Sequence, residues 1–276
     1  MAGRGHLNSV PPIVNESIKM LRNGRWQMMA EPIHNDRPSA GIGLASSFAG
    51  SWQADHANEQ IGLIPCADGG TSLSDWQVGG ALFDHAVAQA KLAQRDSILS
   101  GILWHQGEND CSAEAASVYA DKFEIMINEL RHQLATPDIP VIIGAVGDFL
   151  PKGIYGAYFK EYVLLNDALL AYTKRDKSSH FVAAGDLLAN EDQLHFDAAS
   201  LRKLGIRYYH AFKNRTNVIK HLDDEGNLLE TIYNHIPTAK EQAFVTEINF
   251  ALGKITLNQF LTEIKAISEV RLAEPS

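Results

Sequence analysis

The sequence is poor in cysteine, in basic residues and in long apolar runs, and each shortage excludes a class of protein. It has 276 residues but only two cysteines, Cys66 and Cys111, which are too few for a disulfide framework. Lys and Arg total 24 against 33 for Asp and Glu, so the formal net charge is −9. This acidity argues against a nucleic-acid backbone or an anionic membrane as the partner, because both require a basic patch.

No apolar run is long enough to cross a bilayer, and the amino end has no hydrophobic core of a signal peptide. With so few cysteines, a reduced cytoplasmic setting is the default expectation. No cluster of His, Cys and carboxylate residues has metal-ligand spacing, so we expect chemistry without a metal or another cofactor. The apolar fraction of 45% is ordinary for a globular protein with a good core.

Apolar segments typical of strands alternate along most of the chain with segments of helical periodicity. The expected strands are a hairpin arm at Arg25–Ala30, which follows the turn Asn23-Gly24, and the segments Ile61–Pro65, Leu99–Trp104, Ile139–Val146 and His180–Ala184. The expected helices are Pro12–Arg22, Gly43–His56, Ala81–Gln94, Ala113–Leu134, Tyr158–Thr173 and a helix from the N-cap Asp197 to about Asn214. This alternation predicts a parallel sheet with helices on both faces, which makes three layers.

The alternation ends after Asn214, where the composition becomes that of a helical tail. Ala239–Leu252 and Leu257–Ile267 are predicted as two helices hinged at Gly253. We therefore divide the chain into a domain at residues 1–214 and a helical extension at residues 215–276.

Three polar clusters follow predicted strands: Asp68–Trp76, His105–Asp110 and Asp192–His195. The carboxyl ends of parallel strands share one edge of the sheet, so we expect these clusters to lie close together. In the third cluster, Asp192 precedes His195 by about one helical turn. The carboxylate can therefore orient the imidazole as a general base, although a surface His beside an Asp has the same spacing.

The other two clusters supply neutral hydrogen-bond donors and carboxylates. The Gln106 amide can donate to an oxyanion, or it can satisfy loop carbonyls. Gly70 lets the backbone approach a substrate and present its N–H, with Gly69 as the competing assignment. Glu108 and Asp110 resemble the paired carboxylates of a glycoside hydrolase, but they can equally order the loop by accepting N–H bonds, which we favour.

The sequence does not decide the roles of two aromatic side chains near these clusters. His105 is expected to be structural, packed beside Trp104. Trp76 can stack on a sugar ring or belong to the core.

The string Trp-His-Gln-Gly-Glu at Trp104–Glu108 resembles the third conserved block of the sialate O-acetylesterase and acetylxylan-esterase branch of the SGNH hydrolases. Gly70–Ser72 fits the second block of that branch, and Asp192–Gly205 is similar to the last block. The resemblance implies a flavodoxin-like α/β/α fold. It also implies that His195 is the base, oriented by Asp192, and that Gly70 N–H and Gln106 bind the oxyanion. Glu108 would then support the site.

The first block of the family reads Gly-Gln-Ser-Asn-Met-Ala-Gly-Arg-Gly, and this chain opens with Met1–Gly5 at the fifth position of that block. The nucleophilic serine of the family is therefore not in the sequence, and Ser72 is no substitute. We expect an upstream segment with an apolar strand between Ile61–Pro65 and Leu99–Trp104. Without it, the chain as written is expected to be inactive and poorly soluble.

The resulting functional prediction is a serine-type esterase that removes acetyl groups from an acetylated carbohydrate. Two alternatives remain open. One is a catalytically inactive carbohydrate-binding protein, and the other is a glycoside hydrolase that uses Glu108 and Asp110. The oligomeric state is not predicted.

Overall fold

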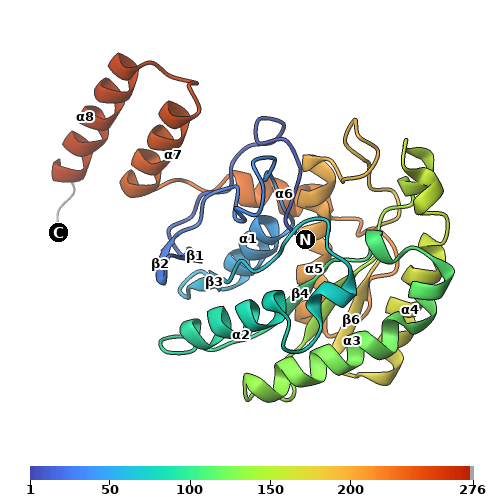
Figure 1. The fold of residues 1–276 in the computed structure, drawn as a ribbon. Helices are drawn as coiled ribbons and strands as arrows, with labels where there is room; N and C mark the ends of the chain where they lie inside the picture. Colours follow the sequence, from blue (N-terminus) through green and yellow to red (C-terminus); the bar gives the residue numbers. More distant parts are fainter. Residues whose placement is uncertain (274–276) are drawn as a thin grey trace.

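Short strands run through the molecule, and helices lie on both sides of the sheet formed by β4, β5 and β6 (Figure 1). The computed structural model describes residues 1–273. The strands are β1 (Ile18–Arg22), β2 (Arg25–Met28), β3 (Ile61–Leu63), β4 (Ile102–Trp104), β5 (Val141–Gly144) and β6 (Ser179–Val182). The helices are α1 (Ala45–Asp55), α2 (Ala81–Ala93), α3 (Ala113–Gln133), α4 (Tyr162–Arg175), α5 (Ala198–Asn214), α6 (Glu225–Tyr233), α7 (Ala239–Ala251) and α8 (Leu257–Ala273).

The strands form two three-stranded sheets, with the orders β2-β1-β3 and β4-β5-β6. In the second sheet all pairing is parallel, with Ile102 opposite Val141 and Val141 opposite Ser179. In the first sheet β3 runs parallel to β1, whereas β2 returns antiparallel from the turn Asn23-Gly24. Both turn residues have positive φ, 52° and 72°, as two-residue hairpin turns require. The predicted parallel α/β architecture is confirmed.

A large cavity separates the two sheets. Within residues 1–273, β3 pairs with β1 alone and β4 pairs with β5 alone, so each keeps one edge without a partner strand. Residues of both strands line a cavity of about 930 Å³. We call this cavity, which lies between the two sheets, the inter-sheet groove. The outer backbone groups of β3 and β4 face it and can pair with a further strand.

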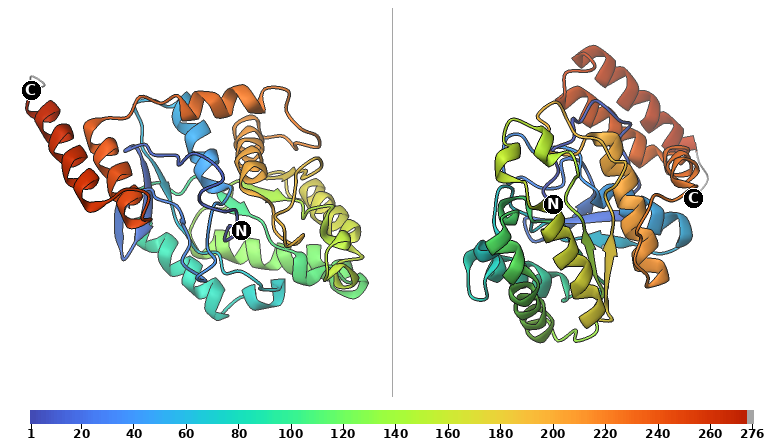
Figure 2. Two further views of the ribbon diagram at one scale, coloured as in Figure 1. Left: turned by 90° about the horizontal axis from the view of Figure 1, so that it is seen from above. Right: turned by 90° about the vertical axis from the view of Figure 1, so that its right-hand side faces the viewer.

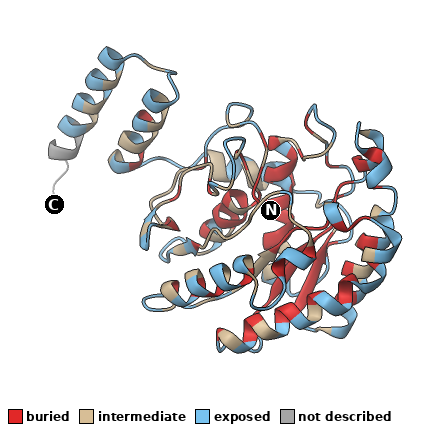
Figure 3. Ribbon diagram, viewed as in Figure 1, coloured by how far each residue is buried: buried red, intermediate tan, exposed pale blue. Residues whose placement is uncertain are grey.

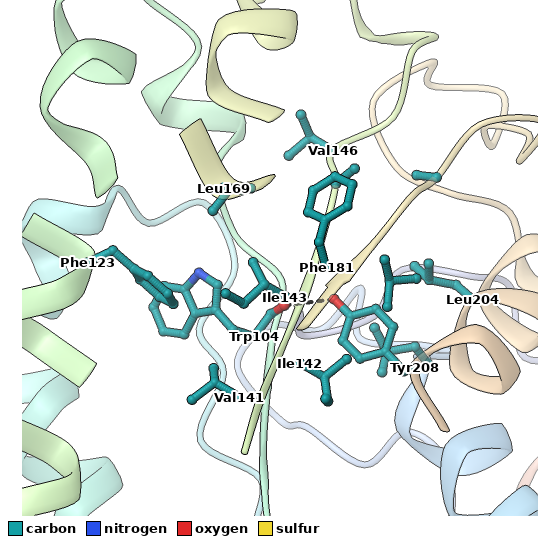
Figure 4. Close-up of a cluster of buried hydrophobic side chains, with 14 of the residues drawn as sticks. Trp104, Phe123, Val141, Ile142, Ile143, Val146, Leu169, Phe181, Leu204 and Tyr208 are labelled. Carbon is teal, nitrogen blue, oxygen red and sulfur yellow. Dashed lines mark hydrogen bonds between the residues drawn. The ribbon is translucent and has the colours of Figure 1, made fainter. Parts of the chain in front are cut away.

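The core of the second sheet shows the three layers directly. Trp104 of β4 packs against Phe123 of α3, with ring centroids 5.3 Å apart. On the opposite face, Leu204 and Tyr208 of α5 approach the strands, and the Tyr208 hydroxyl donates to the Trp104 carbonyl at 2.7 Å (Figure 4). Burying each large apolar side chain contributes roughly 1.5–3 kcal/mol, so this sandwich fixes the strand ends that carry the polar loops.

Most of the expected elements are present, but the predicted helix at Pro12–Arg22 is wrong. Residues Ile18–Arg22 form strand β1, in which Ile18 and Met20 are buried. Tertiary pairing decides this segment, because β1 has β2 on one side and β3 on the other. The predicted helix at Tyr158–Thr173 begins later, at Tyr162, and α6 was not expected.

The tail contains one helix that belongs to the body and two that project from it. Helix α6 packs on α1 and α5. Helices α7 and α8 pack against each other and extend away from the sheets (Figures 1 and 2). Most of their residues are exposed or half-buried, in contrast to the buried strands (Figure 3). The two predicted helices hinged at Gly253, where φ is 68°, are confirmed.

None of the helices within residues 1–273 is both long and apolar enough to cross a bilayer.

Candidate active site

The three polar loops converge at one end of the inter-sheet groove. His195 follows β6, Gln106 follows β4 and Gly70 follows β3, and all three residues line the groove together. Glu108 and Gly69 line it as well. The structure therefore brings together the residues that sequence analysis had placed after separate strands, as the shared carboxyl edge of parallel strands requires.

Asp192 and His195 form a hydrogen-bonded pair at the rim of this groove. The Asp192 Oδ2 atom lies 2.7 Å from His195 Nδ1. The other carboxylate oxygen, Oδ1, accepts the backbone N–H groups of Leu194 and His195, both at 2.9 Å. Both side chains remain partly exposed, 48% for Asp192 and 39% for His195. The pair is thus fixed in geometry but open to a ligand, and Nε2 is the ring nitrogen left for proton transfer.

The charge state of Asp192 suits this role. Partial burial raises the pKa of the carboxyl, but hydrogen bonds from the His195 side chain and from the two backbone N–H groups outweigh it. The net pKa lies below the ordinary Asp value, so the group is ionised at neutral pH. An ionised partner at Nδ1 favours the tautomer that keeps its proton on Nδ1 and stabilises an imidazolium when Nε2 is protonated.

The loop carrying this pair is anchored at both ends. Asn190 N–H donates to the His195 carbonyl at 2.7 Å, and the Asn190 side chain donates to the Arg4 carbonyl at 2.9 Å. Asp197 then caps α5 by accepting the Ser200 N–H at 2.7 Å, which confirms the predicted N-cap. These hydrogen bonds therefore connect the loop that carries His195 to the amino-terminal segment at Arg4.

The turn containing Gly69 and Gly70 is held from three sides. Asp36 Oδ2 accepts the Gly69 N–H at 2.9 Å, and Arg37 donates to the Gly69 carbonyl at 2.8 Å. Asn109 Nδ2 donates to the Gly70 carbonyl at 2.7 Å. Gly70 has φ of 78°, a conformation that favours glycine. These contacts fix the direction of the peptide groups that an oxyanion would meet.

Sequence analysis did not identify the brace behind this turn. Arg4 forms an ion pair with Asp36, and the Asp36 side chain is only 3% exposed. Burial raises the Asp36 pKa, but the hydrogen bonds from Arg4 and the Gly69 N–H outweigh it and hold the pKa below its ordinary value. Asp36 lies in a polar segment, and nothing local in the sequence distinguishes it from a surface turn residue.

Gln106 is fully engaged with protein partners. Its Nε2 donates to the Thr71 carbonyl at 2.8 Å and to Asp110 Oδ2 at 2.7 Å, while its Oε1 accepts from the Tyr119 hydroxyl at 2.7 Å. A primary amide has two N–H groups, so both are used. Gln106 thus satisfies a loop carbonyl, and it can donate to an oxyanion only by exchanging one of these acceptors.

The two carboxylates of the same loop differ in environment. Asp110 is buried, and its Oδ2 accepts from the Leu73 N–H at 2.9 Å as well as from Gln106. Glu108 is half-buried and lines the groove. Asp110 thus orders the loops by accepting N–H bonds, which is the role favoured for it in the sequence. Glu108, in contrast, lines the groove in which a ligand would lie.

Two aromatic residues of interest belong to the interior. Trp76 is buried at 7% exposure, packs edge-on against Trp104 and donates from Nε1 to Thr71 Oγ1 at 3.1 Å. These contacts fit the core role better than stacking on a sugar. His105 is also buried, and burial lowers its pKa to about 3, so it stays neutral.

The tautomer of His105 follows from its neighbour Tyr208. The Tyr208 hydroxyl gives its one proton to the Trp104 carbonyl, so it accepts from His105 Nδ1, 3.2 Å away. His105 Nε2 is then a bare acceptor, and among the described residues it has no partner. His105 lines the inter-sheet groove, so a donor lying there would satisfy it.

The site thus combines an Asp–His pair with a positive-φ glycine turn at the carboxyl edge of parallel strands, an arrangement that is compatible with acyl-transfer chemistry in an α/β fold. Residues 1–273 contain no group of three or more His, Cys, Asp or Glu side chains placed to hold a metal ion. Residues 1–214 match the family model described as carbohydrate esterase, sialic acid-specific acetylesterase. The chain belongs to this family.

Individual relatives agree with the family match. A protein of Arabidopsis thaliana described as "Probable carbohydrate esterase" is 30% identical over 177 residues, which are 55% of this chain and 68% of that protein. An Arabidopsis thaliana crystal structure has a TM-score of 0.69 at 26% identity and covers 78% of this chain and 93% of its own.

Two more distant structures share the fold. The crystal structure of NanS has a TM-score of 0.58 at 14% identity, covering 77% of this chain and 92% of its own. A carbohydrate acetylesterase from Xanthomonas citri has a TM-score of 0.53 at 16% identity, covering 72% of this chain and 49% of that one.

Proposed function

We propose that this protein removes acetyl groups from the hydroxyls of a carbohydrate by a serine-type mechanism. The observation that carries the proposal is the contact of Asp192 with both the ring and the backbone of His195, at the rim of a groove that also contains Gly70 and Gln106. Family membership supports the ester-hydrolase class. In this proposal residues 1–214 form the esterase domain. In the described part of the helical extension that follows residue 214, α6 packs on this domain, whereas α7 and α8 project from it.

The chemistry proceeds in two acyl-transfer steps. A serine hydroxyl attacks the acetyl carbonyl carbon while His195 Nε2 takes the proton, and the oxyanion receives the Gly70 N–H and one N–H of Gln106. Collapse breaks the ester bond, and the sugar oxygen leaves with the proton from His195. Water then attacks the acetyl-serine with the same base, releasing acetate and restoring the serine. Asp192 stabilises the imidazolium in both steps.

The serine in this mechanism lies on an extended segment bound in the inter-sheet groove. A strand parallel to β3 and β4 would pair with both free edges and join the two sheets into one. Its backbone or its serine hydroxyl would supply the donor that His105 Nε2 lacks. The family's first block, Gly-Gln-Ser-Asn, precedes a methionine that corresponds to Met1, and Met1 lines the groove together with His195.

The proposal is tested with two forms of the protein, the chain as written and a form extended upstream by an apolar strand ending in Gly-Gln-Ser-Asn. The extended form is expected to hydrolyse p-nitrophenyl acetate and to release acetate from acetylated sugars. The His195→Ala variant of that form loses this activity. Cleavage of aryl glycosides with no cleavage of aryl acetates would instead favour the glycoside hydrolase with Glu108 and Asp110.

A further inference from the structure

Three large apolar side chains are exposed together in the segment that follows β5. Ile154 is 87% exposed, Tyr155 52% and Tyr158 76%. Isolated exposed apolar residues are ordinary on protein surfaces, but a local group that includes two aromatic rings is typical of a binding surface. We call Ile154, Tyr155 and Tyr158 the tyrosine shelf.

The two tyrosines flank a single tight turn of the backbone. Tyr155 begins and Tyr158 ends a single 3₁₀ turn, in which the Tyr158 N–H donates to the Tyr155 carbonyl at 2.9 Å. Side chains three residues apart are eclipsed in a 3₁₀ turn, so we expect both rings to leave the turn on the same face. Within the turn, Gly156 touches the Pro151 carbonyl so closely that no larger residue fits. The shelf is therefore a defined surface rather than a loose loop.

The shelf lies next to the candidate active site. Before it, Gly153 packs against Gln193, because a Cβ atom at Gly153 would lie 2.9 Å from the Gln193 Cβ and carbonyl oxygen. Gln193 lies between Asp192 and His195 in the chain. After the shelf, Phe159 lines the inter-sheet groove together with His195. The residues on both sides of the shelf thus contact the loop or the groove in which His195 acts.

We propose that the tyrosine shelf binds the sugar rings of the acetylated substrate, beside the acetyl group held at His195. This inference rests on the proposed function and adds the part of the site that recognises carbohydrate. The C–H faces of pyranose rings pack on aromatic rings, and the two phenol groups can exchange hydrogen bonds with sugar hydroxyls. Trp76, the other candidate for stacking, is buried in the core.

A carbohydrate fits the shelf better than a second protein molecule does. Stable protein interfaces bury on the order of 1,000 Å² or more, whereas the shelf has three side chains. One or two sugar rings match an area of that size. The backbone next to the shelf also contacts the catalytic loop, because Gly153, which precedes Ile154, packs against Gln193.

Binding is measured first, since it does not require turnover. Acetylated xylo-oligosaccharides and 9-O-acetyl-N-acetylneuraminic acid are titrated calorimetrically into the extended form in which the added serine is changed to alanine. At least one should bind, and Tyr155→Ala with Tyr158→Ala should weaken that binding at least ~10-fold. The double Phe variant keeps the rings and should stay within ~3-fold. The matched control is Leu257→Ala with Leu261→Ala on α8, where both residues are 55% exposed; it should bind like wild type.

Kinetics of the serine-bearing form separate this inference from the proposed function. The double Ala variant should raise KM for the acetylated sugars and leave p-nitrophenyl acetate hydrolysis unchanged. If that form hydrolyses no acetate ester but the sugars still bind through the tyrosines, the esterase proposal fails and the shelf stands. If neither sugar binds, if the Ala variants bind as wild type does, or if their sole effect is on self-association in gel filtration, the shelf proposal is overturned.

Discussion

Asp192 holds His195 through two different groups, the ring Nδ1 at 2.7 Å and the backbone N–H at 2.9 Å. One carboxylate therefore sets both the rotation of the imidazole and the course of the loop that carries it. The arrangement needs no burial, because the two partners are only three residues apart in the chain and form a closed local ring of contacts.

Replacing Asp192→Asn in the serine-bearing form should lower kcat by on the order of 10³–10⁴-fold, because the amide favours the wrong tautomer and no longer stabilises the imidazolium. KM should change little. Steady-state hydrolysis of p-nitrophenyl acetate measures both constants. Asp223→Asn, at a side chain that is 99% exposed, is the control and should leave them unaltered. A kcat within tenfold of wild type would remove Asp192 from the mechanism.

Gln106→Ala should lower kcat much more than it raises KM, because an oxyanion bond strengthens in the transition state. It should also lower the melting temperature, since Thr71 and Asp110 lose their shared donor. Asn109→Ala removes one hydrogen bond to the Gly70 carbonyl but leaves Gln106 in place. This variant therefore shows how far a loosened loop alone lowers the melting temperature and kcat. A Gln106 variant that loses stability but keeps kcat would show that Gln106 only orders the loops.

Gly70→Ala and Gly79→Ala form a matched pair. Both glycines have positive φ, 78° and 74°, and neither is crowded, since the nearest atom to a Cβ is 3.5 Å away at Gly70 and none lies within 4 Å at Gly79. Each substitution should cost about 1–2 kcal/mol of stability through backbone strain. Only Gly70→Ala should also reduce kcat, because it displaces the N–H offered to the oxyanion. Equal kcat values in the two variants would argue against that role.

The Arg4–Asp36 brace makes stability depend on acid pH. The pKa of Asp36 is held below its ordinary value, so the ionised form is favoured in the folded state. This contribution is present above the unfolded pKa of about 3.9 and is lost as pH falls through the lower folded pKa. Asp36→Asn should therefore be less stable than wild type at pH 6, and the difference should shrink by pH 2–3. Urea unfolding across this range measures it, and a constant difference would contradict the assignment.

The elements with a clear period were predictable from sequence. α3 and α5 have apolar residues at helical spacing with Ser112 and Asp197 as caps, and β5 is apolar throughout. β1 was predicted wrongly as a helix, because its few apolar residues suit a helix or a strand equally well in isolation, although the hairpin arm predicted after Asn23-Gly24 requires a partner strand before the turn. Its pairing with β2 and β3, which are distant from each other in the chain, decides its conformation.

Some contacts of the candidate site could likewise be predicted from the sequence, and others could not. The contact of Asp192 with His195 could be predicted because the two residues are close in sequence, whereas the catalytic interpretation of the pair came from the resemblance to the family. The Arg4–Asp36 pair and the contact of Asn190 with the Arg4 carbonyl join segments far apart in the chain, so no spacing indicates them. The full engagement of Gln106 also arises from tertiary contacts, with Thr71 on one side and Tyr119 on the other.

The most direct test of the account is acetate release by the form extended with an apolar strand and Gly-Gln-Ser-Asn before Met1. Three proteins are compared on an acetylated sugar: this extended form, the same form with the added serine changed to alanine, and the chain as written. Acetate release is expected from the first protein alone, and both extended forms should melt at a higher temperature than the chain as written. Equal acetate release with serine and alanine, or no gain in stability on extension, would contradict a serine-bearing strand in the inter-sheet groove.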